Sequence, residues 1–173
     1  MNSLEARRTA LILIDLMPRI IALDTAPFSG PVVLERSVAL AAATRAAGGL
    51  VVNVRVERPG VDVQPEGSGF APEVAPQPGD LEIVKRTIGA FGRSPLDAEL
   101  QSRGIANVAL AGIATNFGVE STARAASDLG YETFLITDAM TGLDEHAHNF
   151  ALSYVFPRIG EACTTTEYLK AFS

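Results

Sequence analysis

Charged side chains stand at the ends of apolar stretches of this sequence, where they could transfer protons or bind an anion. Asp15 lies near the end of residues 9–16 (TALILIDL), Lys85 directly follows residues 81–84, and Arg55 lies late in another apolar stretch. A carboxyl group beside an ammonium group can act as an acid or base, and a guanidinium group can hold an anion. Structural roles are open as well, because Asp15 could cap a helix or form a salt bridge and Arg55 could be a surface residue.

A turn late in the sequence is a further candidate. The apolar residues 108–111 stop at Gly112, a polar turn follows over residues 115–118, and an alanine-rich helical pattern begins after it. A helix N-terminus presents N–H groups without intrahelical partners, so such a turn can bind an anionic group. Gly118 occupies the place where a nucleophilic Cys or Ser would be sought. Asn116 could belong to the site or only cap the helix.

The apolar pattern indicates which elements carry these residues. Short apolar stretches alternate with helical patterns, which predicts an α/β fold with a parallel sheet between two layers of helices. The expected strands cover residues 9–16, 50–56, 81–84, 105–112, 132–137 and 160–165. The expected helices cover residues 32–47, 96–103, 116–129, 145–156 and 166–172, with Ser94, Asp144 and Thr166 as the caps of the second, fourth and fifth.

This arrangement brings the candidate residues together. In an open parallel sheet, ligands bind beyond the C-terminal ends of the strands, at a topological switch point. Asp15, Arg55, Lys85 and the turn over residues 112–118 all lie at such ends, so we expect them to meet at one edge of the sheet. The Pro- and Gly-rich residues 57–80 form a long loop, and loops of this length inside a compact domain are often functional.

Composition narrows the class of protein. The 173 residues suit a single domain over residues 1–173, and 47% hydrophobic with 20% charged residues indicate a globular chain. A net charge of −6 argues against nucleic-acid binding, and no apolar stretch approaches the length of a membrane span. The single cysteine, Cys163, excludes an intrachain disulfide. Without a signal-peptide pattern, we expect a cytoplasmic protein.

Several stretches taken together resemble the isochorismatase-like hydrolase superfamily, which includes nicotinamidases, N-carbamoylsarcosine amidohydrolases and isochorismatases. The resemblance lies in residues 10–17 (ALILIDLM), 82–100 (EIVKRTIGAFGRSPLDAEL), 110–140 (LAGIATNFGVESTARAASDLGYETFLITDAM) and 156–160 (FPRIG). It implies a six-stranded, mainly parallel, Rossmann-like sheet and a homodimer or homotetramer. It also implies a small-molecule substrate.

The resemblance also indicates a site that lacks its usual nucleophile. Most members use an Asp–Lys–Cys triad; Asp15 and Lys85 match the first two, and Gly118 stands at the Cys position. A thioester intermediate at this position is therefore excluded. Isochorismatases that lack the Cys cleave a vinyl ether, with the Asp protonating a substrate carbon. We expect a hydrolase of this kind, with Asp15 as acid or base, Lys85 as its electrostatic partner and an anionic substrate.

Two other functions stay open at this point. The chain could be an inactive member that serves as a small-molecule-binding or oligomeric interaction protein. It could also be an amidohydrolase that uses Cys163, although the position of Cys163 late in the chain indicates a core residue.

The expected substrate-binding residues surround the turn. They are Arg55, Phe91, Ala114, Thr115, Asn116 and Phe117. Phe91 could instead be plain core. The family's turn often contains a non-proline cis peptide bond, which here would join Ala114 and Thr115.

Neither a metal nor a cofactor is expected. Nicotinamidases place an Asp and two His in the loop after the second strand, whereas the loop here has Asp62 and no His. His146 and His148 are separated by one residue of a predicted helix, so we expect surface positions. The spacing of glycines in the turn does not form a dinucleotide-binding pattern. Two further structural roles are expected: Glu120 and Arg124 as a helical ion pair, and Asp138 as a residue that holds its turn.

Overall fold

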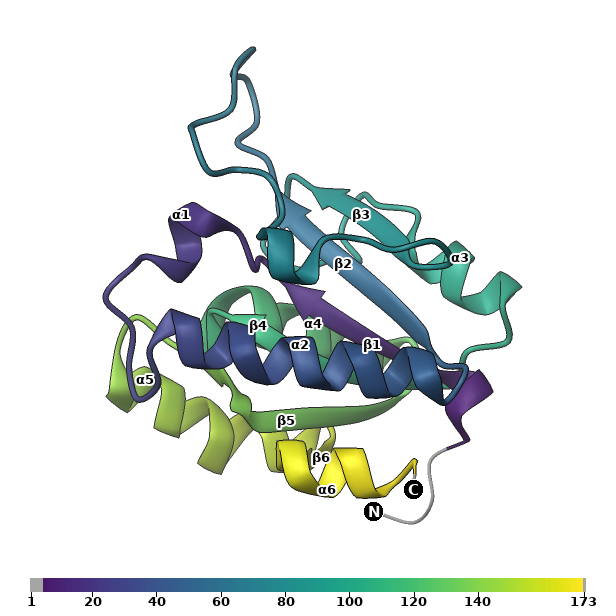
Figure 1. The fold of residues 1–173 in the computed structure, drawn as a ribbon. Helices are drawn as coiled ribbons and strands as arrows, with labels where there is room; N and C mark the ends of the chain where they lie inside the picture. The colour runs from purple at the N-terminus through teal and green to yellow at the C-terminus, as the bar shows by residue number, and fades with distance from the viewer. Residues whose placement is uncertain (1–4, 173) are drawn as a thin grey trace.

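A computed structural model describes residues 5–172 of the chain, and a six-stranded parallel sheet lies at its centre (Figure 1). In spatial order the strands are β3, β2, β1, β4, β5 and β6. Their bounds are β1 Thr9–Ile14, β2 Leu50–Val56, β3 Leu81–Lys85, β4 Asn107–Ile113, β5 Glu132–Thr141 and β6 Glu161–Cys163. The predicted α/β class with a six-stranded, Rossmann-like parallel sheet is confirmed. Residues 1–4 and 173, which the single-domain prediction includes, lie outside the described part.

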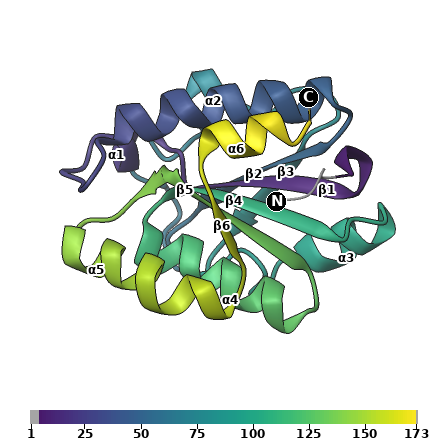
Figure 2. The same cartoon turned by 90° about the horizontal axis from the view of Figure 1, so that it is seen from below.

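Helices cover both faces of the sheet (Figure 2). On one face lie α2 and α6, with α1 at the end of α2, and on the other lie α3, α4 and α5. Their bounds are α1 Pro18–Ile21, α2 Gly30–Ala46, α3 Leu96–Ser102, α4 Glu120–Asp128, α5 Glu145–Phe150 and α6 Thr165–Lys170. No helix within residues 5–172 is long and apolar enough to cross a membrane.

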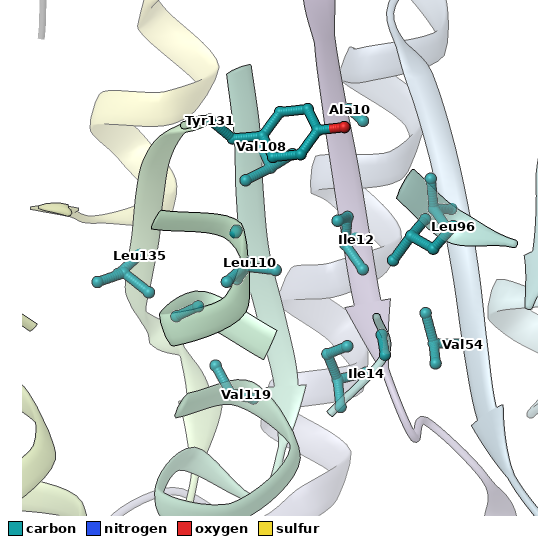
Figure 3. Packing of buried hydrophobic residues seen from close by; sticks show 14 of the residues in the cluster. Ala10, Ile12, Ile14, Val54, Leu96, Val108, Leu110, Val119, Tyr131 and Leu135 are labelled. Carbon is teal, nitrogen blue, oxygen red and sulfur yellow. The ribbon is translucent and has the colours of Figure 1, made fainter. Parts of the chain in front are cut away.

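The central strand β1 is buried on both faces, which explains its unbroken apolar sequence. Successive side chains of a strand point to opposite faces. Ile12 and Ile14 accordingly join the core beneath α3 and α4, where they pack with Leu96 and Val119 (Figure 3). Leu11 and Leu13 point the other way and join the second core, beneath α2 and α6.

The strand order places a topological switch point between β1 and β4. The chain proceeds from β1 outward to β2 and β3, and then returns to form β4 on the other side of β1. The register pairs Ile14 with both Val54 and Gly112, and pairs Val56 with Lys85. The C-terminal ends of four strands therefore meet at one edge, where the sequence led us to expect a site.

The fifth strand is longer than its sequence pattern predicts. The expected end was residue 137, whereas β5 continues to Thr141. The half-buried Thr137 and Asp138 interrupt the apolar pattern, and a register shift beyond Leu110 lets Met140 pair with Gly112.

The starts of α4 and α6 also differ from the prediction. Residues 115–119 form a π-helical turn before α4 begins at Glu120. The cap of α6 is Thr164 rather than Thr166, because the Thr164 side chain and Glu167 form a reciprocal capping box. Asp144 caps α5 as predicted, by accepting a hydrogen bond of 2.8 Å from Ala147 N.

Residues 57–80 form the expected long loop, which projects from the body of the molecule between β2 and β3 (Figure 1). Its outer part is exposed, and the Val63 side chain is 85% accessible. Its returning part contains a short 3-10 helix, Pro72–Val74, and buries Ala71 and Val74 against the core beneath α2.

Candidate active site

Asp15 stands where β1 ends, and its backbone adopts an uncommon conformation. Its φ angle is +52°, in the left-handed region that non-glycine residues seldom adopt. Asp15 N donates to Val54 O over 2.9 Å, and Met17 N donates to Asp15 O over 2.8 Å. Such strained residues cluster at functional sites, so the position of Asp15 is itself a signal of function.

Lys85, the last residue of β3, forms a buried ion pair with Asp15. Lys85 Nζ lies 2.8 Å from Asp15 Oδ2, and the two side chains are only 3% and 8% accessible. Nζ also donates to Ile88 O over 2.9 Å and to Thr87 O over 3.3 Å. An ammonium group has three hydrogens, so these three acceptors engage all of them and hold Nζ beside the carboxyl group.

The surroundings of Asp15 favour its protonated form. Burial raises the pKa of Asp15 above its ordinary value, whereas the charge and hydrogen bond of Lys85 and the charge of Arg19 lower it. Burial is the larger effect. Among residues 5–172, Asp15 Oδ1 is buried with no hydrogen-bond partner, which makes the ionised form costly.

Gly118 lies beside Asp15, in the π-helical turn that follows β4. A Cβ atom on Gly118 would lie 2.9 Å from Ile14 Cγ2 and 3.3 Å from Asp15 Oδ2. A side chain at this position would therefore enter the space beside the carboxyl group. Thr122 Oγ1 donates to Gly118 O over 2.6 Å and fixes the turn on the first residues of α4.

The approach to this turn requires a glycine at Gly112. Its φ angle is +125°, and a Cβ atom there would collide with the carbonyl oxygen of Ile14 on the neighbouring strand. A non-proline cis peptide bond follows, but it joins Ile113 and Ala114. The expected position between Ala114 and Thr115 is thus wrong by one residue.

His148 contacts the π-helical turn through Thr115. Its predicted surface position is wrong. The side chain is buried, and its Nδ1 lies 2.8 Å from Thr115 Oγ1. The ring also packs edge-on against Phe28, with 6.5 Å between ring centroids. A helical spacing could not reveal this burial, because it depends on the π-helical turn packed beside α5. His146 is exposed, as expected.

A cavity of about 480 Å³ opens above the Asp15–Lys85 pair. Five of the nine predicted site residues line it: Asp15, Lys85, Ala114, Phe117 and Gly118. Four apolar residues of its lining are exposed: Leu23, Ile88, Phe117 and Leu143. The other predicted site residues, Arg55, Phe91, Thr115 and Asn116, lie outside its lining.

Each of these four residues has other surroundings in the structure. Arg55 pairs with Glu57 at 2.8 Å and with Glu82 at 3.6 Å. Phe91 stacks on Tyr131 with 5.9 Å between ring centroids and packs against the core, which agrees with its structural interpretation. Thr115 faces His148, as described above. The Asn116 carbonyl oxygen is buried, with no hydrogen-bond partner in the described part of the chain.

The sequence interpretation missed three cationic residues of the cavity: Arg19, Arg58 and Arg86. Arg86 directly follows β3 and Arg58 lies two residues after the end of β2, so the rule that located Lys85 could have found them. Arg19 had no such signal, because it lies on α1, a short helix that the apolar pattern does not predict.

Comparison with known proteins places this chain in a family. The family model described as the isochorismatase domain matches residues 9–167. The chain belongs to the isochorismatase family of hydrolases. It is similar to the isochorismatase family protein YwoC of Bacillus subtilis (strain 168), with 40% identity over 98% of each chain. The solved structure of an isochorismatase family protein from Burkholderia thailandensis superposes with a TM-score of 0.88, at 36% identity and 96% coverage of each chain.

Part of this isochorismatase-family chain also matches an enzyme with a named reaction. Ureidoacrylate amidohydrolase RutB of Variovorax paradoxus (strain S110) is 37% identical over 58% of this chain and 40% of its own length. The match supports hydrolase chemistry in general rather than one reaction.

Three other titratable residues of this chain, Cys163, Asp138 and Glu120, are engaged in packing, hydrogen bonds or an ion pair. Cys163 is buried in the core beneath α2 and α6, and burial together with nearby carboxylates raises the pKa of its thiol to about 12. Asp138 Oδ1 accepts hydrogen bonds from Thr165 N and Oγ1, and Glu120 pairs with Arg124 at 2.9 Å. Within residues 5–172, no three His, Cys, Asp or Glu residues are grouped as metal ligands would be.

Proposed function

We propose that this isochorismatase-family hydrolase cleaves a small anionic molecule without a covalent enzyme intermediate, with Asp15 as acid and base and Lys85 as its electrostatic partner. One observation carries the proposal: the buried Asp15–Lys85 pair forms the floor of a cavity beside Gly118, which has no side chain. Burial raises the pKa of Asp15, and a carboxyl group with a raised pKa is better suited to act as a general acid.

The cavity lining supports chemistry without a nucleophile. Among its lining residues in the described chain, only Thr87 bears a hydroxyl group, and its single hydrogen is shared between Gly89 O and Gly92 O, which lie 2.8 and 2.9 Å from Thr87 Oγ1. Cys163 packs in the core beneath α2 and α6 and does not line the cavity. Water is therefore the nucleophile in the proposed reaction.

Vinyl-ether hydrolysis suits these groups. Protonated Asp15 transfers its proton to the terminal alkene carbon, and the ether carbon becomes an oxocarbenium ion. Water adds to that carbon and loses a proton to the carboxylate, which restores the acid. The resulting hemiketal collapses to a carbonyl compound and an alcohol, so the net reaction consumes one water.

Lys85 acts at the intermediate stage of this reaction. When Asp15 gives up its proton, a carboxylate forms in a buried place, and the ammonium group 2.8 Å away stabilises it. Because three acceptors hold Nζ, this stabilisation needs no rearrangement. Lys85 therefore assists proton release, while burial favours the protonated form of the carboxyl group.

A variant at Asp15 tests the proposal. Isochorismate, small enol ethers and then small amides form the substrate panel. Asp15→Asn keeps the size of the side chain, and asparagine tolerates the left-handed backbone at this position, so the fold should be retained. We expect turnover to fall at least about 100-fold. The control is Asp128→Asn, an exposed residue at the end of α4.

Two results would contradict the proposal. If Asp15→Asn turned over every active substrate as fast as the unmodified protein, Asp15 would have no acid–base role. If the unmodified protein bound members of the panel but converted none, it would be a small-molecule-binding protein instead.

A further inference from the structure

Arg19 differs from the other cations of the cavity in how it is held. It lies on α1, shortly after Asp15, and is half-buried. Its Nε donates to Ser68 Oγ over 2.9 Å, and its backbone N–H donates to Gly67 O over 3.3 Å. Ser68 is itself buried, so the loop after β2 fixes the guanidinium group from the side.

The remaining donors of Arg19 have no carboxylate to bind. Within residues 5–172, no Asp or Glu oxygen lies within 4.0 Å of an Arg19 nitrogen; the nearest printed partner is the neutral Ser68. A guanidinium group presents five N–H donors in a planar fork. With Nε engaged by Ser68, the terminal nitrogens can bind both oxygens of one carboxylate.

The other cations that line the cavity are engaged or exposed. Lys85 is surrounded by its three acceptors, and Arg86 pairs with Glu57 at the surface, where its side chain is 64% accessible. Arg58 is exposed, and in the described residues only its backbone groups form hydrogen bonds. Arg19 is thus the cation that is both held in place and available to a ligand.

The cavity as a whole favours an anion with an apolar body. Four cationic side chains and two carboxyl groups line it, in a chain whose net charge is −6. The rest of the lining is mostly apolar, and includes Val56, Ile113 and Phe117. An inorganic anion would leave these apolar walls uncovered, whereas a small organic acid would cover them.

We propose that Arg19 binds the carboxylate of the substrate, so that the substrate is a small carboxylic acid whose apolar or unsaturated part reaches Asp15. Ser68 is the positioning residue that holds Arg19 in place. This inference rests on the proposed function for the reaction at Asp15. It assigns the specificity for the acid to α1 and the loop after β2, rather than to Arg55, whose charge is paired with Glu57 and Glu82.

Binding of two matched probes tests the role of Arg19. Benzoate and benzamide have the same shape, but only benzoate carries a carboxylate. By isothermal titration calorimetry, Arg19→Gln should weaken benzoate binding by about 10- to 100-fold, the range expected when a charged hydrogen-bonded pair is lost. The same variant should bind benzamide as the unmodified protein does, which also shows that the cavity is intact.

Two further variants separate contact from general charge. Arg86→Gln removes an exposed cation of the same cavity, and we expect benzoate binding to change by less than about threefold, because exposed charges interact weakly. Ser68→Ala should weaken benzoate binding and leave benzamide binding unchanged, and Ser68→Thr, which keeps the hydroxyl group, should restore it.

Several outcomes would overturn the inference. It fails if benzoate does not bind the unmodified protein, if Arg19→Gln binds benzoate unchanged, or if Arg86→Gln weakens it equally. Failure of the proposed function has a different result, because Asp15→Asn would then retain turnover while benzoate binding still depended on Arg19.

Discussion

Gly118 and Asp15 face each other so closely that a Cβ atom on Gly118 would stand 3.3 Å from Asp15 Oδ2. The turn after β4 and the end of β1 thus share one small space above the Lys85 ammonium group. A side chain at position 118 would compete with the substrate for the carboxyl group. The absence of a side chain there is a geometric requirement of the acid–base chemistry that we propose.

Gly118→Ala should therefore reduce turnover at least about tenfold and lower the free energy of unfolding by about 1–3 kcal/mol, the range for overpacked sites. The added methyl group meets Ile14 Cγ2 at 2.9 Å, and Ile14 is fully buried and cannot retreat. Steady-state kinetics and urea unfolding measure the two effects. Gly69→Ala is the control, because nothing lies within 4 Å of its added methyl group. Equal effects in both variants would contradict the argument.

The sheet and three residues of the site, Asp15, Lys85 and Gly118, can be predicted from the sequence, because each is marked by a local sequence signal. Strands buried on both faces have unbroken apolar sequences, as β1 has, and the charged residues that end them stand out. Asp15 and Lys85 are such residues, whereas Gly118 is located by the resemblance to a family, which gives the position of the absent nucleophile. The meeting of these residues follows from parallel pairing alone.

The remaining features depend on contacts between distant segments. Arg19 lines the cavity because Ser68, far along the chain, holds its side chain. His148 is buried because the π-helical turn presents Thr115 to it. Arg55 seemed suited to anion binding by its strand position, but neighbouring carboxylates on β3 and after β2 neutralise it. Apolar periodicity carries no information about such partners.

Lys85→Met should raise the pKa of Asp15. Lys85 lowers the pKa of this carboxyl group through its charge and its hydrogen bond, so only burial and the weaker effect of Arg19 would remain. The pKa can be followed by ¹³C NMR of the Asp15 carboxyl carbon, with Asp15→Asn to assign the signal. In the same variant, any pH-dependent limb of kcat/KM that reports Asp15 should move to higher pH. An unchanged or lower pKa would show that Lys85 does not act on Asp15 as the structure indicates.

Cys163 should resist thiol reagents in the native protein. Its side chain is 4% accessible, and a pKa of about 12 leaves little of the reactive thiolate at neutral pH. We expect its reaction with Ellman's reagent to be at least about 100-fold slower in buffer than in denaturing urea. Rapid modification of the native protein would contradict this expectation. Loss of turnover in Cys163→Ser, with the fold intact, would revive the hypothesis of a relocated nucleophile.

The free energy of unfolding should fall as the pH drops below about 6.5, through His148. Burial lowers the pKa of His148 in the folded protein, although Glu145 acts weakly in the opposite direction. Between the ordinary pKa of about 6.5 and the lower folded value, the unfolded chain binds a proton that the folded protein excludes, so stability decreases by up to about 1.4 kcal/mol per pH unit. Above pH 6.5 both states are neutral, and this contribution to the pH dependence disappears.

Urea unfolding of His148→Gln across this range should lack this decrease, whereas His146→Gln, which alters an exposed histidine of the same helix, should retain it. Identical pH dependence in the two variants would show that the burial of His148 does not disfavour its protonation.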